Sequence, residues 1–368
     1  MDALLNAVSQ LQWQQVVMWA IGGLLIFLAI KKDMEPTLLL PMGFGAILVN
    51  LPLSGAVGEE GALTVLFNAG IANELFPLLL FVGIGAMIDF TPVLSNPKLM
   101  IFGAAAQFGI FFTLSVASLF FDLKDAASIA IIGAADGPTS IFVANHFGSN
   151  YMPAIMVAAY SYMALVPIVQ PPVIKAITTK KERLIRMEYA GKEVSKTTKI
   201  LFPIIITVVA GLVAPESVAL VGFLMFGNLI RECGVLNSLS ETAQKVLANL
   251  ITLFLGLTVA TKMQAEAFLT KETLLILGLG LVAFVFDTVG GVFVAKIYNL
   301  FAKKKLNPMI GAAGISAFPM SARVINKMGL QEDNQNFLLM HAVGVNVSGQ
   351  IASVIAGGLI LTMIGPMI

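Results

Sequence analysis

Residues 131–146 read Ile-Ile-Gly-Ala-Ala-Asp-Gly-Pro-Thr-Ser-Ile-Phe-Val-Ala-Asn-His, an apolar run of mostly small residues with one acid, Asp136, inside it. Gly137 and Pro138 follow the acid and interrupt a helix. A carboxylate at membrane depth is costly, so it usually faces a cavity and marks an ion or proton site. A broken helix at that depth needs protein or water to satisfy its backbone. The stretch therefore predicts a discontinuous helix that carries an ion site. The alternative is an interfacial aspartate that caps a helix beginning at Pro138.

The composition is that of a polytopic membrane protein. Of the 368 residues, 58% are hydrophobic and 12% are charged, and the mean hydropathy is +0.90; soluble domains carry about 25% charged residues. The net charge of +1 gives no reason to expect nucleic acid as a partner. The single cysteine, Cys233, excludes an internal disulfide and a CxxC motif. The sequence contains no phosphate-binding loop, nucleophile elbow or HExxH motif.

Charge predicts the topology. No basic residue precedes the first apolar span, and Lys31 and Lys32 follow it, so we expect a retained helix with the N-terminus outside. The loop 175–199 has eight basic against three acidic residues and should lie in the cytoplasm. If 126–147 crossed the membrane fully, that loop would lie outside. We therefore expect 126–147 to be a re-entrant or broken-helix hairpin.

The second half repeats this organisation. Ile132-Gly-Ala-Ala-Asp136 matches Ile310-Gly-Ala-Ala-Gly314 at a spacing of 178 residues. The predicted fold is an all-α polytopic membrane protein, an inverted repeat with about ten transmembrane helices plus two re-entrant or broken-helix hairpins, and with the C-terminus outside. The hairpin tips would meet near the midplane. The expected units are a first repeat over 1–178 with the hairpin 126–147, a basic cytoplasmic linker over 179–199, and a second repeat over 200–368 with the hairpin 307–325.

Polar side chains in and beside the hairpins could hold a cation. Na⁺ is a hard cation that prefers oxygen ligands, and unwound backbone supplies carbonyl groups as well. Asp136 offers a negative charge, and Asn307, Ser316 and Thr139 could complete the shell. The alternative is that the small residues allow close helix packing. We favour that explanation for three residues taken singly, namely Ser348, Gly349 and Ser353.

Three further residues have both a chemical and a packing interpretation. Arg323, in the second hairpin, can hold a carboxylate by two parallel hydrogen bonds, or it can be a juxtamembrane arginine. Tyr162 can pass a proton only if its pKa falls from about 10, or it can simply be packed in the membrane. For the intramembrane Asp287 we favour a scaffold role over a second ion site.

Four segments resemble the β subunits of the bacterial biotin-dependent, sodium-pumping decarboxylases, the glutaconyl-CoA, methylmalonyl-CoA and oxaloacetate enzymes. The resemblance covers essentially the whole chain. The segments are Gly133-Ala-Ala-Asp136-Gly-Pro-Thr-Ser140, Tyr160-Ser-Tyr162-Met-Ala-Leu-Val-Pro167, the spacing Asn307-x3-Gly311-x4-Ser316-x6-Arg323, and Asn346-Val-Ser-Gly-Gln350.

The resemblance implies a membrane subunit that decarboxylates carboxybiotin on a carrier subunit and couples this to Na⁺ export with consumption of a proton. It implies the bacterial inner membrane as location, and biotin held by a partner rather than by this chain. The implied partners are a biotin carrier subunit, a carboxyltransferase α subunit, a small membrane-anchored subunit and further copies of this chain. The chain lacks a longer N-terminal region, which favours an acyl-CoA substrate over oxaloacetate. The alternatives are a secondary Na⁺-coupled carboxylate transporter of the same build and, less favoured, an ion channel.

The resemblance also implies roles for individual residues. Asp136 would be the Na⁺-binding and coupling carboxylate, Tyr162 would deliver the proton to biotin, and Arg323 would bind the carboxyl group of carboxybiotin. The Na⁺ site of the second half would be shaped by Asn307, Gly311 and Ser316. The remaining candidate Na⁺ ligands are Thr139, Asn346 and Ser348. We expect the two hairpins and the spans after them to form a mobile core, and the other spans to form a scaffold.

Overall fold

The computed structural model describes residues 9–32, 36–188 and 193–368, and every regular element in these ranges is helical. Six helical segments are long and apolar enough to cross a membrane, or up to eight if each of two bent pairs is one span. The all-α class is confirmed, whereas the ten spans expected from the sequence are not. The six are Trp13–Lys31, Pro97–Ala117, Lys196–Val213, Asn237–Lys262, Lys271–Phe301 and Leu339–Met367.

The first half contains several short or interrupted helices where the sequence predicted continuous spans. One bent pair is Ala62–Gly70 with Leu75–Met87, at 64°. The elements in chain order are α2 (Trp13–Lys32), α3 (Pro36–Val49), α4 (Ala62–Gly70), α5 (Leu75–Met87), α6 (Thr91–Ser95), η1 (Pro97–Leu99), α7 (Met100–Ala105), α8 (Phe108–Ala117), α9 (Leu123–Ala130), η2 (Ile131–Ala134), α10 (Gly137–His146) and α11 (Met152–Ile177).

Proline explains the second bend, which is in α11. The segments Ala154–Met163 and Leu165–Ile177 meet at 68°. Pro167 has no N–H to donate to the carbonyl group of Met163, four residues earlier, and its ring crowds that carbonyl. The helix therefore changes direction one turn before Pro167.

The second half has the longer helices. Its elements in chain order are α12 (Lys180–Arg183), α13 (Lys196–Val213), η3 (Pro215–Ser217), α14 (Val218–Glu232), α15 (Asn237–Glu241), the π-helical η4 (Thr242–Leu247), α16 (Ala248–Val259), η5 (Ala260–Lys262), α17 (Ala265–Phe268), α18 (Lys271–Phe301), the 3₁₀ element η6 (Pro308–Gly314), α19 (Met320–Glu332), α20 (Leu339–Ile364) and η7 (Gly365–Met367).

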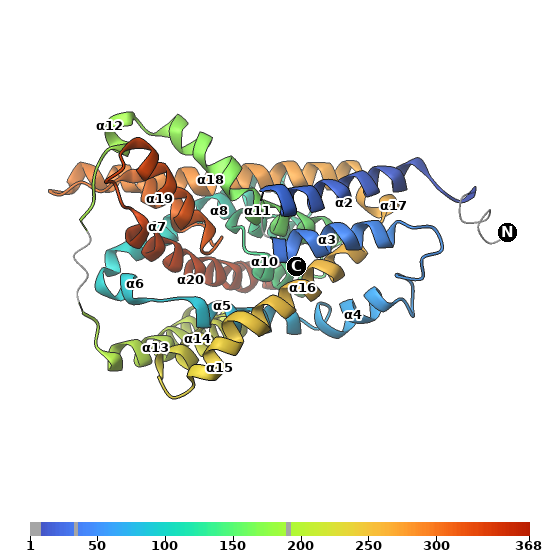
Figure 1. Ribbon diagram of the computed structural model, residues 1–368, viewed down its shortest axis with the longest axis horizontal. Coiled ribbons are helices and arrows are strands. Elements are labelled where there is room, and N and C mark those ends of the chain that lie inside the picture. Colours follow the sequence, from blue (N-terminus) through green and yellow to red (C-terminus); the bar gives the residue numbers. More distant parts are fainter. Residues whose placement is uncertain (1–8, 33–35, 189–192) are drawn as a thin grey trace.

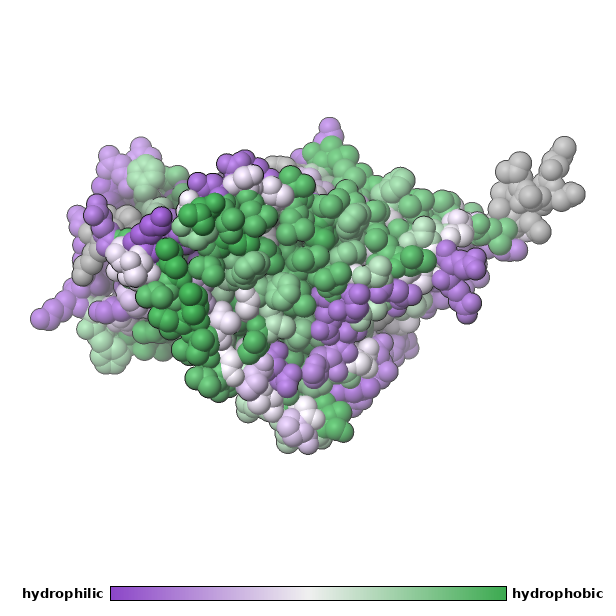
Figure 2. All heavy atoms as spheres, turned by 90° about the horizontal axis from the view of Figure 1, so that it is seen from below, coloured by the Kyte–Doolittle hydropathy of each residue, from purple (hydrophilic) through white to green (hydrophobic). Residues whose placement is uncertain are grey.

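Helices from the two halves pack against each other throughout the molecule. α3 packs on α16 and α14 packs on α5, while α11 packs on α18 and α20 packs on α7. The long α18 runs along one side, and α13–α15 lie on the opposite side (Figure 1). On the face shown in Figure 2, hydrophobic residues cover much of the middle, and hydrophilic residues gather at the left end and toward the lower right. Such extended apolar surface is unusual for soluble proteins and suits contact with lipid.

Glycines allow the closest of these helix contacts. A Cβ atom placed on Gly85 of α5 would lie 1.8 Å from the carbonyl oxygen of Leu224 on α14. A Cβ atom on Gly227 of α14 would lie 2.1 Å from the carbonyl oxygen of Val82. The two backbones therefore touch at positions where any side chain would force the helices apart.

We predict that Gly85→Ala destabilises the protein by about 1–3 kcal/mol, because the methyl group must push the α5 and α14 backbones apart. The measurement is thermal unfolding in detergent, where the melting temperature should fall. Gly278→Ala is the matched control, since a Cβ atom at Gly278 would have no neighbour within 4 Å. Equal melting temperatures for the two variants would contradict the close contact.

Candidate ion site

The chain breaks where the sequence predicts, between η2 and α10. Ala135 has a left-handed backbone with φ of +50°, and Asp136 is extended and caps α10. Pro138 fits the first turn of α10, because a helix needs no N–H donor there. Gly137 has no room for a side chain, since a Cβ atom would lie 2.4 Å from the ring of Tyr160. Asp136 is thus a helix cap, as in the alternative interpretation, but it is only 2% exposed rather than interfacial.

Hydrogen bonds hold the Asp136 carboxylate without neutralising it. Its Oδ2 accepts from Thr139 Oγ1 at 2.8 Å and from Ser353 Oγ at 3.0 Å, and its Oδ1 accepts from the Thr139 backbone N–H at 3.4 Å. None of the ion pairs formed by the described residues includes Asp136. A buried carboxylate with neutral donors alone is well suited to receive a cation.

The second broken segment meets the first directly. The backbone N–H of Ser316, just beyond η6, donates to the carbonyl oxygen of Ala134 at the end of η2, at 3.0 Å. The Ser316 hydroxyl donates to the Gly349 carbonyl group on α20 at 3.2 Å. The two interrupted elements, predicted from a short sequence repeat, therefore share a backbone hydrogen bond beside Asp136.

One face of α20 connects both broken segments. Asn346 donates to the Ile315 carbonyl group at 2.7 Å, Gln350 donates to that of Ser316, and Ser353 donates to Asp136. These three residues are spaced i, i+4 and i+7, which places them on one side of a helix. That spacing is a readable signal, and the expectation that Ser353 serves packing alone was wrong.

A cavity of about 210 Å³ adjoins the meeting point. Asp136, Tyr160, Ser316 and Gln350 are among its lining residues. The hydroxyl group of Tyr160 and Oε1 of Gln350 are buried, and neither atom has a hydrogen-bond partner among the described residues. Tyr160 and Gln350 occur in two of the segments that carry the family resemblance, but nothing in the order of residues placed them beside Asp136.

The predicted Na⁺ ligands fall into two groups. Thr139, Ser316 and Asn346 lie at the meeting point, through the hydrogen bonds described above. Ser348 instead donates to the Val345 and Leu99 carbonyl groups, toward α7.

Asn307 and Gly311 lie elsewhere on the second broken segment and do not line the cavity. The side chain of Asn307 donates to the Arg183 and Ile185 carbonyl groups at 2.8 and 2.9 Å. The seven residues of η6, about 14 Å at the 3₁₀ rise, separate it from the Ser316 end. At Gly311 a Cβ atom would lie 2.1 Å from the Gly291 carbonyl oxygen, so this glycine allows η6 to contact α18.

Tyr162 and Arg323 also lie outside this cavity. Tyr162 is buried and donates its hydroxyl hydrogen to the Leu277 carbonyl group of α18. Arg323 is exposed on α19 and has no ion pair within the described ranges. Its guanidinium group is therefore accessible to a carboxylate that arrives from outside the chain.

Asp287 lies where a second helix is interrupted. Its Oδ1 accepts from the Gly109 backbone N–H at 2.5 Å, in the first turn of α8 and just after the break between α7 and α8. A carboxylate satisfies unpaired N–H groups at a helix start. This contact agrees with the scaffold role that we favoured for Asp287.

Ion pairs join α12 and the residues just after it to the end of α19. Arg183 pairs with Glu332 at 2.6 Å, and Arg186 pairs with Asp333 at 2.5 Å. The hydrogen bond from Arg186 holds the pKa of Asp333 below its ordinary value. Asn336, like Asn307, donates to the Arg183 carbonyl group, at 3.0 Å. The residues after α11 thus fix the start of η6 relative to α19.

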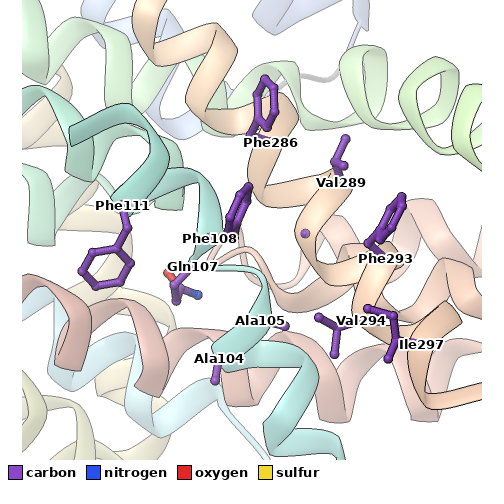
Figure 3. A pocket seen from close by; sticks show the side chains of 11 residues that line it. Ala104, Ala105, Gln107, Phe108, Phe111, Phe286, Val289, Phe293, Val294 and Ile297 are labelled. Carbon is purple, nitrogen blue, oxygen red and sulfur yellow. The ribbon is translucent and has the colours of Figure 1, made fainter. Parts of the chain in front are cut away.

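A larger cavity, of about 580 Å³, has a different chemistry. Phe108 and Phe111 from α8 and Phe286 and Phe293 from α18 lie around it, and Gln107 is its one strongly polar lining residue (Figure 3). An apolar lining offers a cation no ligands. The smaller cavity beside Asp136 is therefore the candidate site.

The fold and the site together define an ion-coupled membrane protein, since a buried carboxylate lies where two interrupted helices meet. The particular family follows from comparison with known proteins. Residues 14–364 match the family described as the Na⁺-transporting oxaloacetate decarboxylase beta subunit, and the chain belongs to this family.

Curated relatives agree with that assignment. The methylmalonyl-CoA decarboxylase subunit beta of Propionigenium modestum is 47% identical over 376 residues, covering 95% of each chain. The glutaconyl-CoA decarboxylase subunit beta of Acidaminococcus fermentans is 47% identical over 354 residues, covering 96% of this chain and 94% of its own. The oxaloacetate decarboxylase beta chain of Klebsiella pneumoniae is 43% identical over 409 residues, covering 94% of each chain. The resemblance found in the sequence is confirmed.

We predict that Ser353→Ala raises the Na⁺ concentration for half-maximal decarboxylation roughly three- to ten-fold, because Oδ2 of Asp136 loses a donor that orients it. The assay is the Na⁺ dependence of the assembled decarboxylase. Thr362→Ala is the control on the same helix, since among the described residues the Thr362 hydroxyl bonds only to the Gly358 carbonyl group of its own helix. A similar Na⁺ dependence for both variants would remove Ser353 from the site.

Proposed function

We propose that this chain is the membrane subunit that decarboxylates carboxybiotin held by a partner carrier and couples the reaction to Na⁺ export. The observation that carries the proposal is the buried Asp136 carboxylate, which neutral donors hold and no described cation pairs with. Membership of a Na⁺-transporting decarboxylase family favours this function over a secondary carboxylate transporter.

Coupling requires one structural element whose conformational equilibrium is shifted both by Na⁺ binding and by carboxybiotin binding. Moving one charge against 100 mV costs about 2.3 kcal/mol. The free energy of decarboxylation can supply this only if CO₂ release does not occur without Na⁺ movement. Na⁺ at Asp136 and carboxybiotin at a second position must favour different states of one element. The backbone hydrogen bond between Ser316 and Ala134 joins the two broken segments and makes them candidates for that element. In this proposal these segments, with α11 and α20, form the mobile core.

The two halves are proposed to be inverted repeats, over 1–178 and 200–368, joined by the basic linker 179–199. Under a two-fold relation, if one element packs on a second, then the repeat of the first packs on the repeat of the second. With α14 as the repeat of α3 and α16 as the repeat of α5, the contact of α3 with α16 is matched by that of α14 with α5. With α20 as the repeat of α11 and α18 as the repeat of α7, the contact of α11 with α18 is matched by that of α20 with α7. The charge pattern supports both termini outside the bacterial inner membrane and the linker inside.

Carboxybiotin would be recognised by Arg323. The exposure of this side chain suits a substrate that arrives on a separate carrier subunit. The guanidinium group can bind a carboxylate through two parallel hydrogen bonds. Tyr162 would supply the proton that decarboxylation consumes, after its hydroxyl group leaves the Leu277 carbonyl group.

The proposed assembly contains a biotin carrier subunit, a carboxyltransferase α subunit, a small membrane-anchored subunit and further copies of this chain. Biotin would stay on the carrier. The acid substrate would be an acyl-CoA. This chain of 368 residues matches the acyl-CoA decarboxylase relatives over 349–376 residues, which is close to its own length, whereas it matches the oxaloacetate decarboxylase relatives over 409–417 residues.

We predict that Asp136→Asn abolishes the Na⁺ activation of decarboxylation, because the amide keeps the shape of the side chain and removes its charge. Arg323→Lys is the matched variant: it keeps the charge and loses the planar fork, so carboxybiotin turnover should fall while Na⁺ activation is kept. Both are measured as Na⁺-dependent decarboxylation by the assembled complex. Near-normal Na⁺ activation in Asp136→Asn would remove Asp136 from the centre of the mechanism.

A further inference from the structure

The cavity beside Asp136 has two walls of different origin. The meeting point of the broken segments provides Asp136, Tyr160, Ser316 and Gln350. The opposite wall comes from α3, α5 and the continuous η4–α16 segment, and it is not apolar throughout. Its polar lining residues are Thr37, Gln244, Asn249 and Thr252.

Charge decides what can enter this cavity. Asp136 is the one acidic residue among the described lining residues, and none of them is Lys, Arg or His. A carboxylate would meet Asp136 with no cation to compensate either charge. A cation would meet a carboxylate surrounded by neutral oxygen atoms. The cavity therefore suits Na⁺ and not the carboxyl group of carboxybiotin, whose proposed partner, Arg323, is not part of the lining.

Two oxygen atoms at the inner end lack partners. The Tyr160 hydroxyl group and Gln350 Oε1 are buried without a hydrogen bond to any described residue. A buried polar atom left unpaired costs about 1–3 kcal/mol, so such atoms in a native protein call for a ligand or water. Hydroxyl and amide oxygen atoms are ligands that a hard cation accepts.

The size of the cavity fits a hydrated ion. Water occupies about 30 Å³ per molecule in the liquid, so 210 Å³ has room for about seven waters or for one ion with part of its shell. Sites for drug-sized ligands have volumes of about 300–1,000 Å³.

The polar residues that line the cavity differ in exposure. Thr37 and Asn249 are exposed, Gln244 and Thr252 are half-buried, and Tyr160 is 2% exposed. Thr37 begins α3, and Gln244 lies in η4, just ahead of α16. The charge-based topology puts these helix ends on the cytoplasmic side, where exported Na⁺ must enter.

We propose that this cavity is the route by which hydrated Na⁺ reaches Asp136 from the cytoplasm. Asn249 lies at its mouth, and the Tyr160 and Gln350 oxygen atoms replace water at its inner end. This inference rests on the proposed function and adds the path and two ligands to it. The geometry that carries it is a single cavity whose lining includes both exposed Asn249 and buried Asp136.

Charge at the mouth tests the route. Asn249→Asp should lower the Na⁺ concentration for half-maximal decarboxylation about five-fold, and Asn249→Lys should raise it about five-fold, with little change at saturating Na⁺. Lys303→Gln is the control, because it changes the charge by the same amount as Asn249→Asp, on an exposed residue between α18 and η6 that does not line the cavity. It should shift the Na⁺ dependence less than about two-fold.

The inner end has its own test. Tyr160→Phe keeps the ring against Gly137 and removes the unpaired hydroxyl group, so the half-saturating Na⁺ concentration should rise about ten-fold. Unchanged Na⁺ dependence in the Asn249 variants, or an equal shift in Lys303→Gln, overturns the route. If Asp136→Asn has meanwhile lost Na⁺ activation, the proposed function stands without this route; if it has kept activation, the proposed function fails.

Discussion

The Asp136 carboxylate is buried, charged when ionised, and paired with no cation among the described residues. Such a group is stable only if neutral donors, water or a bound cation replace the hydration that it loses. Thr139 and Ser353 supply the donors, and these residues lie on elements more than two hundred positions apart in the chain. Because Ser353 belongs to α20, the Asp136 carboxylate is held in this way only if α20 packs close to the first broken segment.

The need to provide buried polar groups with hydrogen-bond partners also explains how the second broken segment is held. Its unwound backbone after η6 would leave buried carbonyl groups unpaired, and Asn346 and Gln350 of α20 bind two of them. Ser316 completes the connection by donating to Ala134. A ligand change at Asp136 can thus reach the second segment through α20 and through one backbone hydrogen bond. The unpaired oxygen atoms of Tyr160 and Gln350 lie where such a ligand would be felt first.

Sequence patterns predicted the helical class, the break at Asp136 and the family, because each depends on local residue order or on motifs. The number of spans was not confirmed, because helices such as α3 and α14, with 14 and 15 residues, are shorter than the roughly 20 residues that a membrane span needs. Thr139 could be predicted as a partner of Asp136 because it follows three residues later. Tyr160 could not, because only the folded chain places it beside Asp136, whereas Ser353 belongs to a polar face of α20 that its spacing from Asn346 and Gln350 reveals. Asn307, chosen from a motif, bonds to the Arg183 carbonyl group at the far end of η6.

The central claim is that decarboxylation of biotin-bound carboxyl groups drives Na⁺ through this subunit. It is tested most directly by Na⁺ uptake into inverted membrane vesicles that contain the assembled complex, driven by the acyl-CoA substrate and measured with and without avidin. The account predicts substrate-driven uptake that avidin abolishes, because avidin sequesters the biotin of the carrier. Substrate-driven uptake that persists in the presence of avidin would contradict it.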